Sequence, residues 1–153
     1  MKRETQTPTS LRHHIELLRE QARNQHLHSL LDPEATERQW LEIPTSTDLQ
    51  LWLMSWPPGA ESGWHDHGEA TGAFTVLSGR LVERRWNAGV WLDWLWPGDT
   101  RAFLGNHIHN VGNDGKETAL SLHVYAPRLT TMTRYDLVDG MLETAGVEKT
   151  GRW

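Results

Sequence analysis

The sequence contains no cysteine, so no disulfide framework can hold the fold together. It has no run of lysine or arginine and its formal net charge is -5, which argues against nucleic acid or an anionic membrane as the main partner. No stretch approaches the roughly 20 apolar residues that a membrane span needs. Residues 1–6 lack the apolar core of a signal peptide, and together with the absence of cysteine they favour a cytoplasmic protein.

The overall composition is that of a globular domain with a substantial core. Hydrophobic residues make up 37% and charged residues 23% of the 153 positions, so we expect one domain spanning residues 1–153. Nine tryptophans are many for a chain of this size. Because each tryptophan can bury a large area, they predict a compact β core or a pocket with aromatic walls.

The first part of the chain, residues 1–41, is predicted to be helical. Apolar residues recur at spacings of three and four from Leu11 to Ala22, and this helix is expected to end near Leu31, before an Asp-Pro pair. A second short helix is expected between Glu34 and Trp40.

The pattern changes to short strands in residues 49–136. Glycine, proline, asparagine and aspartate separate short apolar runs at intervals of about 8–12 residues, which is typical of a β-sandwich or small barrel. We assign no function to the weakly patterned tail after Asp136. The expected strands are 49–56, 73–77, 81–86, 90–96, 100–104, 108–111 and 119–125.

Two histidines, His65 and His67, form the most informative motif. Side chains two residues apart on a strand point to the same face, so both imidazoles can reach one metal ion while Asp66 points away. His109 is a third candidate ligand, with His107 as its rival on the same strand face. Three neutral imidazoles with an open position would make a site capable of chemistry.

The glycine spacing around this motif, from Gly59 to Gly79, resembles the first cupin motif. The run Pro97-Gly98-Asp99, followed by His109 and then Asn113, resembles the second, and this spacing favours His109 over His107. The resemblance implies an all-β fold with N-terminal helices, built as a small cupin-type β-barrel (jelly roll). Many cupins carry a glutamate ligand where this chain has Gly72 or Thr71.

A cupin with three histidines and no glutamate resembles the thiol dioxygenases of the cysteine dioxygenase family. The run Ser121-Leu122-His123-Val124-Tyr125-Ala126-Pro127 is similar to that family's Ser-x-His-x-Tyr strand. The resemblance implies that Ser121, His123 and Tyr125 form a catalytic relay on one strand face, and that the Ala126–Pro127 bond is cis. Some members cross-link the tyrosine to a cysteine, but here the matching position is Gly72.

The substrate carboxylate needs a cation, and the resemblance leaves two regions in competition for this role. Arg134 stands where mercaptopropionate-type members place their arginine, whereas Arg38 and Gln39 lie near the position used by cysteine-specific members. When residues are counted without gaps from the His65/His67 pair, Gln39 and not Arg38 falls at that position. This favours Arg134 as the residue that binds the carboxylate. An Arg38 that enters the cavity would instead favour cysteine.

The sequence therefore predicts a ferrous dioxygenase that converts a small thiol carboxylic acid, of the cysteine or 3-mercaptopropionate type, to its sulfinic acid with dioxygen. Three histidines add no negative charge to Fe²⁺, which suits a substrate that brings an anionic sulfur. Another cupin dioxygenase or isomerase remains an alternative, as does a non-catalytic cupin that senses a metal or ligand. The sequence does not indicate an oligomeric state.

Overall fold

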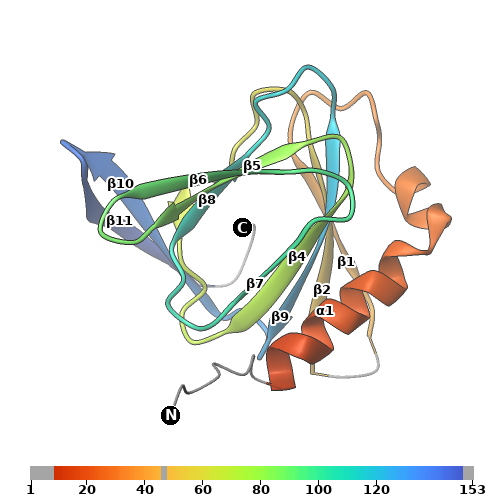
Figure 1. Cartoon of the computed structure of the whole chain (residues 1–153), viewed down its shortest axis with the longest axis horizontal. Helices are drawn as coiled ribbons and strands as arrows, with labels where there is room; N and C mark the ends of the chain where they lie inside the picture. Colours follow the sequence, from red (N-terminus) through yellow and green to blue (C-terminus); the bar gives the residue numbers. More distant parts are fainter. Residues whose placement is uncertain (1–8, 46–47, 150–153) are drawn as a thin grey trace, which may run out of the picture.

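The computed structural model describes residues 9–45 and 48–149, so residues 1–6, which carry the signal-peptide expectation, lie outside it. Two antiparallel sheets face each other as a jelly roll behind one N-terminal helix (Figure 1). The strands do not close into a single barrel, which corrects that detail of the prediction. No helix in the described part of the chain is long and apolar enough to span a membrane.

The first sheet carries the strands that the helix covers. Its order is β1-β2-β9-β4-β7, and α1 packs against it through contacts with β4, β9 and β7. Leu18, which is fully buried, comes from the helix and joins the apolar cluster on this outer face. The elements are α1 (Thr9–Ala22), β1 (Gln39–Ile43), β2 (Gln50–Trp56), β4 (Thr71–Ser78), β7 (Thr100–Phe103) and β9 (Ala119–Ala126).

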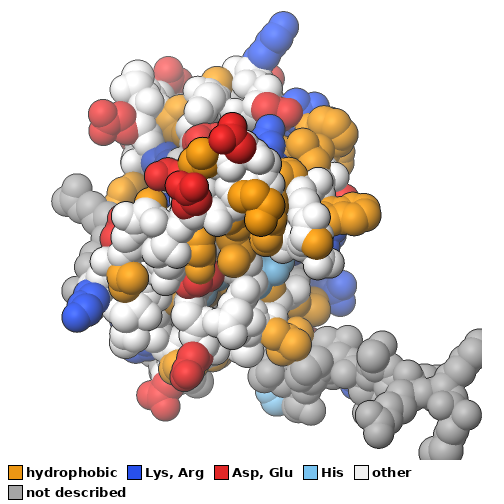
Figure 2. All heavy atoms as spheres, turned by 90° about the vertical axis from the view of Figure 1, so that its left-hand side faces the viewer, with side chains coloured by type: hydrophobic (Ala, Val, Ile, Leu, Met, Phe, Trp, Pro, Cys, Tyr) orange, Lys and Arg blue, Asp and Glu red, His pale blue; other side chains and the backbone are white. Residues whose placement is uncertain are grey.

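The second sheet has the order β11-β10-β3-β8-β5-β6 and ends in a long hairpin, drawn in blue at the left of Figure 1. Seen from that side, the surface carries hydrophobic side chains among charged ones (Figure 2). The strands are β3 (Trp64–His65), β5 (Leu81–Trp86), β6 (Val90–Leu95), β8 (His109–Gly112), β10 (Thr131–Val138) and β11 (Met141–Lys149).

The N-terminal segment differs from its prediction in two places. The helix ends at Ala22, and a separate 3₁₀ helix, η1 (Gln25–Ser29), follows. The predicted helix from Glu34 to Trp40 is wrong, because the chain turns after Asp32 and then forms β1. The Gln39 side chain accepts from the Asp32 N–H and donates to its carbonyl, and this closes the turn and starts the strand.

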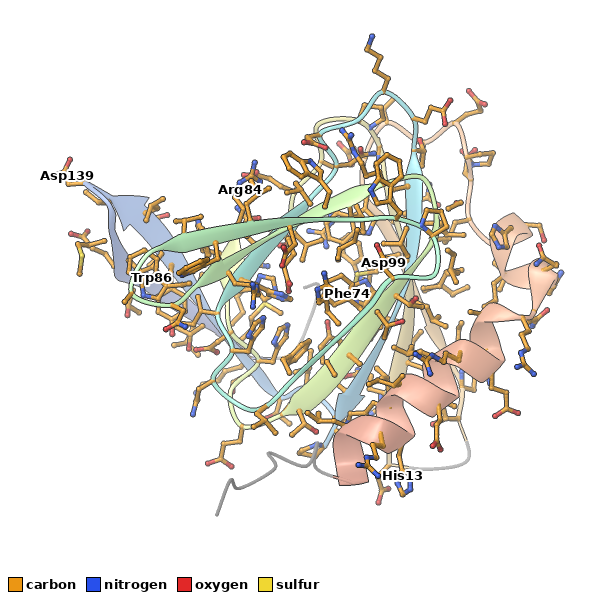
Figure 3. All side chains as sticks on the ribbon, viewed as in Figure 1. His13, Phe74, Arg84, Trp86, Asp99 and Asp139 are labelled. Carbon is orange, nitrogen blue, oxygen red and sulfur yellow. The ribbon has the colours of Figure 1, made fainter. Side chains whose placement is uncertain are left out.

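The tryptophans are spread between core and surface. Trp56 and Trp64 are buried, whereas Trp91, Trp94 and Trp96 are more than half exposed along or just after the edge strand β6. The expectation that the tryptophans build a compact core or the walls of a pocket therefore holds for only some of them. The interior between the sheets instead mixes aromatic rings with imidazoles, and Phe74 points into it from β4 (Figure 3).

Candidate metal centre

Strand pairing brings His65 and His109 together. His65 on β3 lies directly opposite His109 on β8, so the two side chains project from neighbouring strands toward the same interior. Their Nε2 atoms are 3.1 Å apart. Both side chains are almost completely buried, with exposed fractions of 5% and 3%.

His67 reaches the same point from a turn. β3 ends at His65, so the expectation that both histidines share a strand face is wrong in its geometry. The turn forms because Asp66 accepts from the Gly68 N–H and Gly68 adopts a positive φ of 58°, a conformation that glycine tolerates easily. Asp66 also accepts from the Tyr135 hydroxyl at 2.6 Å, which ties the turn to β10.

The three imidazoles can hold one metal ion. One nitrogen from each of His65, His67 and His109 lies within 4.8 Å of the others. His107 lies outside this group and belongs to a second one with Glu83 and His109. The structure thus brings the three predicted ligands together, and His107 is not part of their group.

The hydrogen bonds of the site fix which ring nitrogens are free to bind a metal. His65 Nδ1 lies 2.8 Å from the Gly63 carbonyl, and His109 Nδ1 lies 2.8 Å from the Glu83 carboxylate. Because a carbonyl can only accept and the carboxylate is ionised, both Nδ1 atoms carry a proton and both neutral rings present a lone pair at Nε2. Two lone pairs 3.1 Å apart repel each other, and a metal ion bound by both nitrogens would relieve this repulsion.

The protonation states agree with ligation. Burial lowers the pKa of all three histidines, and the neighbouring imidazoles lower those of His65 and His67 further, so the rings are neutral near pH 7. Within the described residues, neither ring nitrogen of His67 has a hydrogen-bond partner although the side chain is buried. A buried polar group without a partner is costly, and a metal ion would satisfy it.

Gly72 has no room for a larger side chain. A Cβ atom there would lie 2.6 Å from Cζ of Phe103 and 2.8 Å from the Val124 carbonyl oxygen. Phe103 stacks on His67, with ring centroids 4.7 Å apart, and thus fills the place of the missing glutamate. Neither a carboxylate ligand nor a cysteine cross-linked to Tyr125, the strand partner of Gly72, fits in this core.

We expect Gly72→Ala to lower the free energy of unfolding by about 1–3 kcal/mol, since the new methyl group overpacks the core. Gly146→Ala is the matched control, because nothing lies within 4 Å of the added atom and β11 is exposed there. Urea unfolding of the two variants checks this. Equal, small effects in both would show that the core adjusts around residue 72.

A narrow cavity of about 20 Å³ lies beside the histidines. Such a space holds little more than one water molecule, although the flexible thioethers in its wall can move aside for a small substrate. Of the residues that the structure describes, no aspartate or glutamate lines it. The cavity is lined by Arg38, Met54, Trp56, Ser62, His65, His109, Val111, His123, Tyr125 and Met132.

The Ser121–His123 pair forms a directed chain of hydrogen bonds. Trp56 Nε1 donates to Ser121 Oγ at 2.8 Å, so the hydroxyl proton of Ser121 is free to donate to His123 Nε2 at 2.7 Å. When Ser121 donates in this direction, His123 carries its proton on Nδ1; burial lowers the pKa of His123 to about 3. The sequence analysis places Trp56, a member of this chain, only at the end of the expected strand 49–56.

Tyr125 lies on the same face of β9 and contributes to the cavity wall. Its ring centroid is 6.5 Å from that of His123 and 5.0 Å from that of His67. Burial raises the pKa of the phenol far above its usual value, although Arg38 partly opposes this shift. The Tyr125 hydroxyl stays protonated and can donate a hydrogen bond. The predicted cis bond between Ala126 and Pro127, just beyond it, is confirmed.

The two candidate arginines occupy different places. The guanidinium of Arg38 lies 4.3 Å from the ring centre of Trp56, at the cavity wall, and burial together with nearby Arg134 lowers its pKa to about 10. Arg134 on β10 donates to the Ser62 carbonyl and, at 3.2 Å, to Glu148. Gln39 is engaged with Asp32. Among the described candidates, Arg38 is thus the cation at the cavity.

Solved structures of other proteins share the fold of this chain. The structure is similar to that of a protein from Thermus thermophilus, with 25% identity, a TM-score of 0.58, and coverage of 66% of this chain and 93% of that one. A double-stranded β-helix protein from Klebsiella pneumoniae is 20% identical, with a TM-score of 0.58 and coverage of 78% and 94%. An oxalate oxidase is 15% identical, with a TM-score of 0.57 and coverage of 67% and 57%, which shows the shared fold alone.

The family assignment comes from the sequence of the N-terminal and central parts. The model of cysteine dioxygenase type I matches residues 11–91, more than half of the chain, including the turn that carries His65 and His67. With a jelly-roll fold and a buried cluster of three histidines, the chain belongs to the cysteine dioxygenase type I family.

Proposed function

We propose that this protein is a ferrous thiol dioxygenase that converts a small thiol carboxylic acid of the cysteine type to its sulfinic acid. The reaction balances as one thiol plus one dioxygen giving one sulfinic acid, with the sulfur as the only electron donor. The observation that carries the proposal is the convergence of His65, His67 and His109 as neutral ligands beside a cavity that Arg38 makes cationic.

The donor set fits a divalent ion of intermediate softness. Three imidazoles suit iron, and also zinc, copper or nickel. When bound, a ferrous ion would supply the redox-active, Lewis-acidic centre at which thiolate and dioxygen react. Because none of the described residues that line the cavity is a carboxylate, none of them competes with an anionic thiolate for the cation.

The remaining residues bind and orient the substrate. The Arg38 guanidinium can pair with the substrate carboxylate through two parallel N–H donors, and its position against Trp56 fixes the plane of that fork. The protonated Tyr125 hydroxyl can donate a hydrogen bond to a substrate in the cavity. Ser121 holds His123 in one tautomer, so the imidazole beside Tyr125 has a fixed orientation.

The test of the function is oxygen uptake by protein loaded anaerobically with Fe²⁺, measured with cysteine, 3-mercaptopropionate and cysteamine, together with detection of the sulfinic acid. We expect one oxygen molecule consumed per sulfinate formed. Oxygen uptake that does not depend on a thiol would contradict the proposal, and so would an iron-loaded protein that is inert to all three thiols, as a metal-binding sensor would be.

Tyr125→Phe should retain the metal and lose roughly 100-fold in turnover, the low end of the effect of a positioned proton-handling group. The reason is that Tyr125 contacts the cavity but lies outside the ligand set. Metal content and oxygen uptake, measured on the same preparation, separate the two effects. Loss of metal, or an unchanged rate, would show that the hydroxyl has a different role.

A further inference from the structure

Glu83 is a buried carboxylate beside the metal centre that the family resemblance did not single out. Its exposed fraction is 1%, and its Oε2 atom lies 2.8 Å from His109 Nδ1 and 3.4 Å from His107 Nε2. We propose that Glu83 is the positioning residue of the centre: it orients His109 toward the metal and supplies, through that ring, the negative charge that three histidines lack. This role rests on the metal centre proposed above.

The register of the sheet brings the Glu83 side chain close to His109. β5 and β8 are antiparallel neighbours, with Glu83 opposite Val111 and Arg85 opposite His109. Glu83 and His109 are therefore diagonal neighbours on one face of the sheet, close enough for a side-chain hydrogen bond. Because Val111 also faces the interior, the alternation of β5 turns the Glu83 carboxylate inward.

The hydrogen bond makes His109 different from the other ligands. His65 donates its Nδ1 proton to a neutral carbonyl, whereas His109 donates to a carboxylate. A carboxylate draws the Nδ1 proton toward itself and makes Nε2 a stronger donor to a metal, and it also prevents rotation of the ring. His109 is thus the best oriented and most electron-rich of the three candidate ligands.

The charge of Glu83 is only partly compensated without a metal. Glu83 accepts from His109 Nδ1 through Oε2 at 2.8 Å. Its nearest cation is Arg85, whose Nε lies 3.9 Å away, and that arginine also pairs with Asp93. Within the described residues Oε1 accepts no hydrogen bond. A dication behind His109 would supply the missing positive charge, so metal and carboxylate should stabilise each other.

The test is a comparison of wild type, Glu83→Gln and the surface control Glu143→Gln. Iron affinity is measured anaerobically with Fe²⁺ in competition with a chromogenic chelator, and thermal unfolding is followed with and without Fe²⁺. We expect Glu83→Gln to bind iron 10- to 100-fold more weakly, which is about 1.4–2.7 kcal/mol of lost metal-dependent stabilisation. Its metal-free form should be at least as stable as wild type, and Glu143→Gln should match wild type in both measurements.

Equal iron affinity in wild type and Glu83→Gln would overturn the role, and so would an equal loss of stability in the metal-free and iron-loaded forms, since a purely structural residue behaves in that way. A wild type that binds no iron would overturn the metal centre itself. ¹⁵N spectra of the histidine rings in metal-free wild type test the orientation without any variant. We expect His109 with its proton on Nδ1, and a proton on Nε2 instead would contradict the proposal.

Discussion

Replacing His109 with alanine is expected to remove most of the bound metal, whereas replacing His107 is expected to leave the metal content close to that of wild type. His109 contributes one of the three convergent imidazoles, and its loss leaves only His65 and His67. His107 lies outside that group: it stacks on Phe103, with ring centroids 5.0 Å apart, meets the His109 ring edge-on at 4.9 Å, and lies 3.4 Å from Glu83. We therefore expect His107→Ala to weaken metal binding by several-fold at most.

The measurement is metal content after anaerobic loading with Fe²⁺ and removal of excess, with circular dichroism to show that both variants are folded. Thermal unfolding gives a second readout, since a ligand that binds only the folded state raises its stability. Iron should raise the midpoint of wild type and His107→Ala but not that of His109→Ala. Equal losses from both variants, or a loss from His107→Ala alone, would move the ligand set to the group that contains Glu83.

The strands were predictable because their ends carry strong local signals. Pairs such as Ser78-Gly79 and the Pro97-Gly98-Asp99 run break the apolar runs, and Gly79 and Gly98 adopt the positive φ values of 73° and 91° that favour glycine. The observed strands from β2 to β9 agree with the expected ranges to within about two residues, apart from β3. These boundaries depend on the turn-forming residues next to them, so a single sequence is enough to predict them.

The errors occur where distant contacts decide the structure. Residues 34–40 have a composition compatible with a helix. The pairing of β1 with β2 and the hydrogen bond from the Asp32 N–H to the Gln39 side chain override this local preference. The strands β10 and β11 pair mainly with each other, and their surface-exposed residues give little hydrophobic alternation. Periodicity reports burial, so a strand with little burial leaves only a faint pattern.

The metal ligands could be predicted, but their supporting residues could not. The His65/His67 pair and His109 carry recognisable spacings. Glu83 stands in the run Leu81–Trp86, where nothing in the sequence connects it to a histidine 26 residues away. Phe103 likewise lies opposite Gly72 on the neighbouring strand and stacks on His67, two positions far from it in the sequence. Such partners are defined by sheet register, which a single sequence does not reveal.

The same limit applies to the choice between the two arginines. Counting residues along the chain favours Arg134 as the carboxylate-binding residue, but such counting does not show which side chain faces the cavity. In the structure β10 pairs with β3, and Arg134 lies next to Ser62 and Glu148, whereas Arg38 enters the cavity just before β1. Under the expectation drawn from the family, an arginine at the Arg38 position favours cysteine as substrate.

We therefore expect Arg38→Ala to lower kcat/KM for cysteine by about 2–5 kcal/mol of transition-state binding, which is roughly 30- to 5,000-fold. The loss of the carboxylate partner explains this effect. Arg134→Ala is the matched control and should change kcat/KM by less than about 5-fold, since its guanidinium already binds protein groups.

Cysteamine, which lacks the carboxylate, separates substrate binding from damage to the site. Its kcat/KM should be nearly the same in wild type and Arg38→Ala, because the Arg38 guanidinium has no carboxylate to pair with in this substrate. Wild type should also use cysteine at least as well as 3-mercaptopropionate. A larger loss in Arg134→Ala than in Arg38→Ala, together with a preference for 3-mercaptopropionate, would mean that Arg134 turns into the cavity when substrate binds and that the mercaptopropionate-type interpretation is correct. An equal loss for cysteine and cysteamine in Arg38→Ala would instead show that Arg38 supports the cavity wall through Trp56 and does not bind the carboxylate.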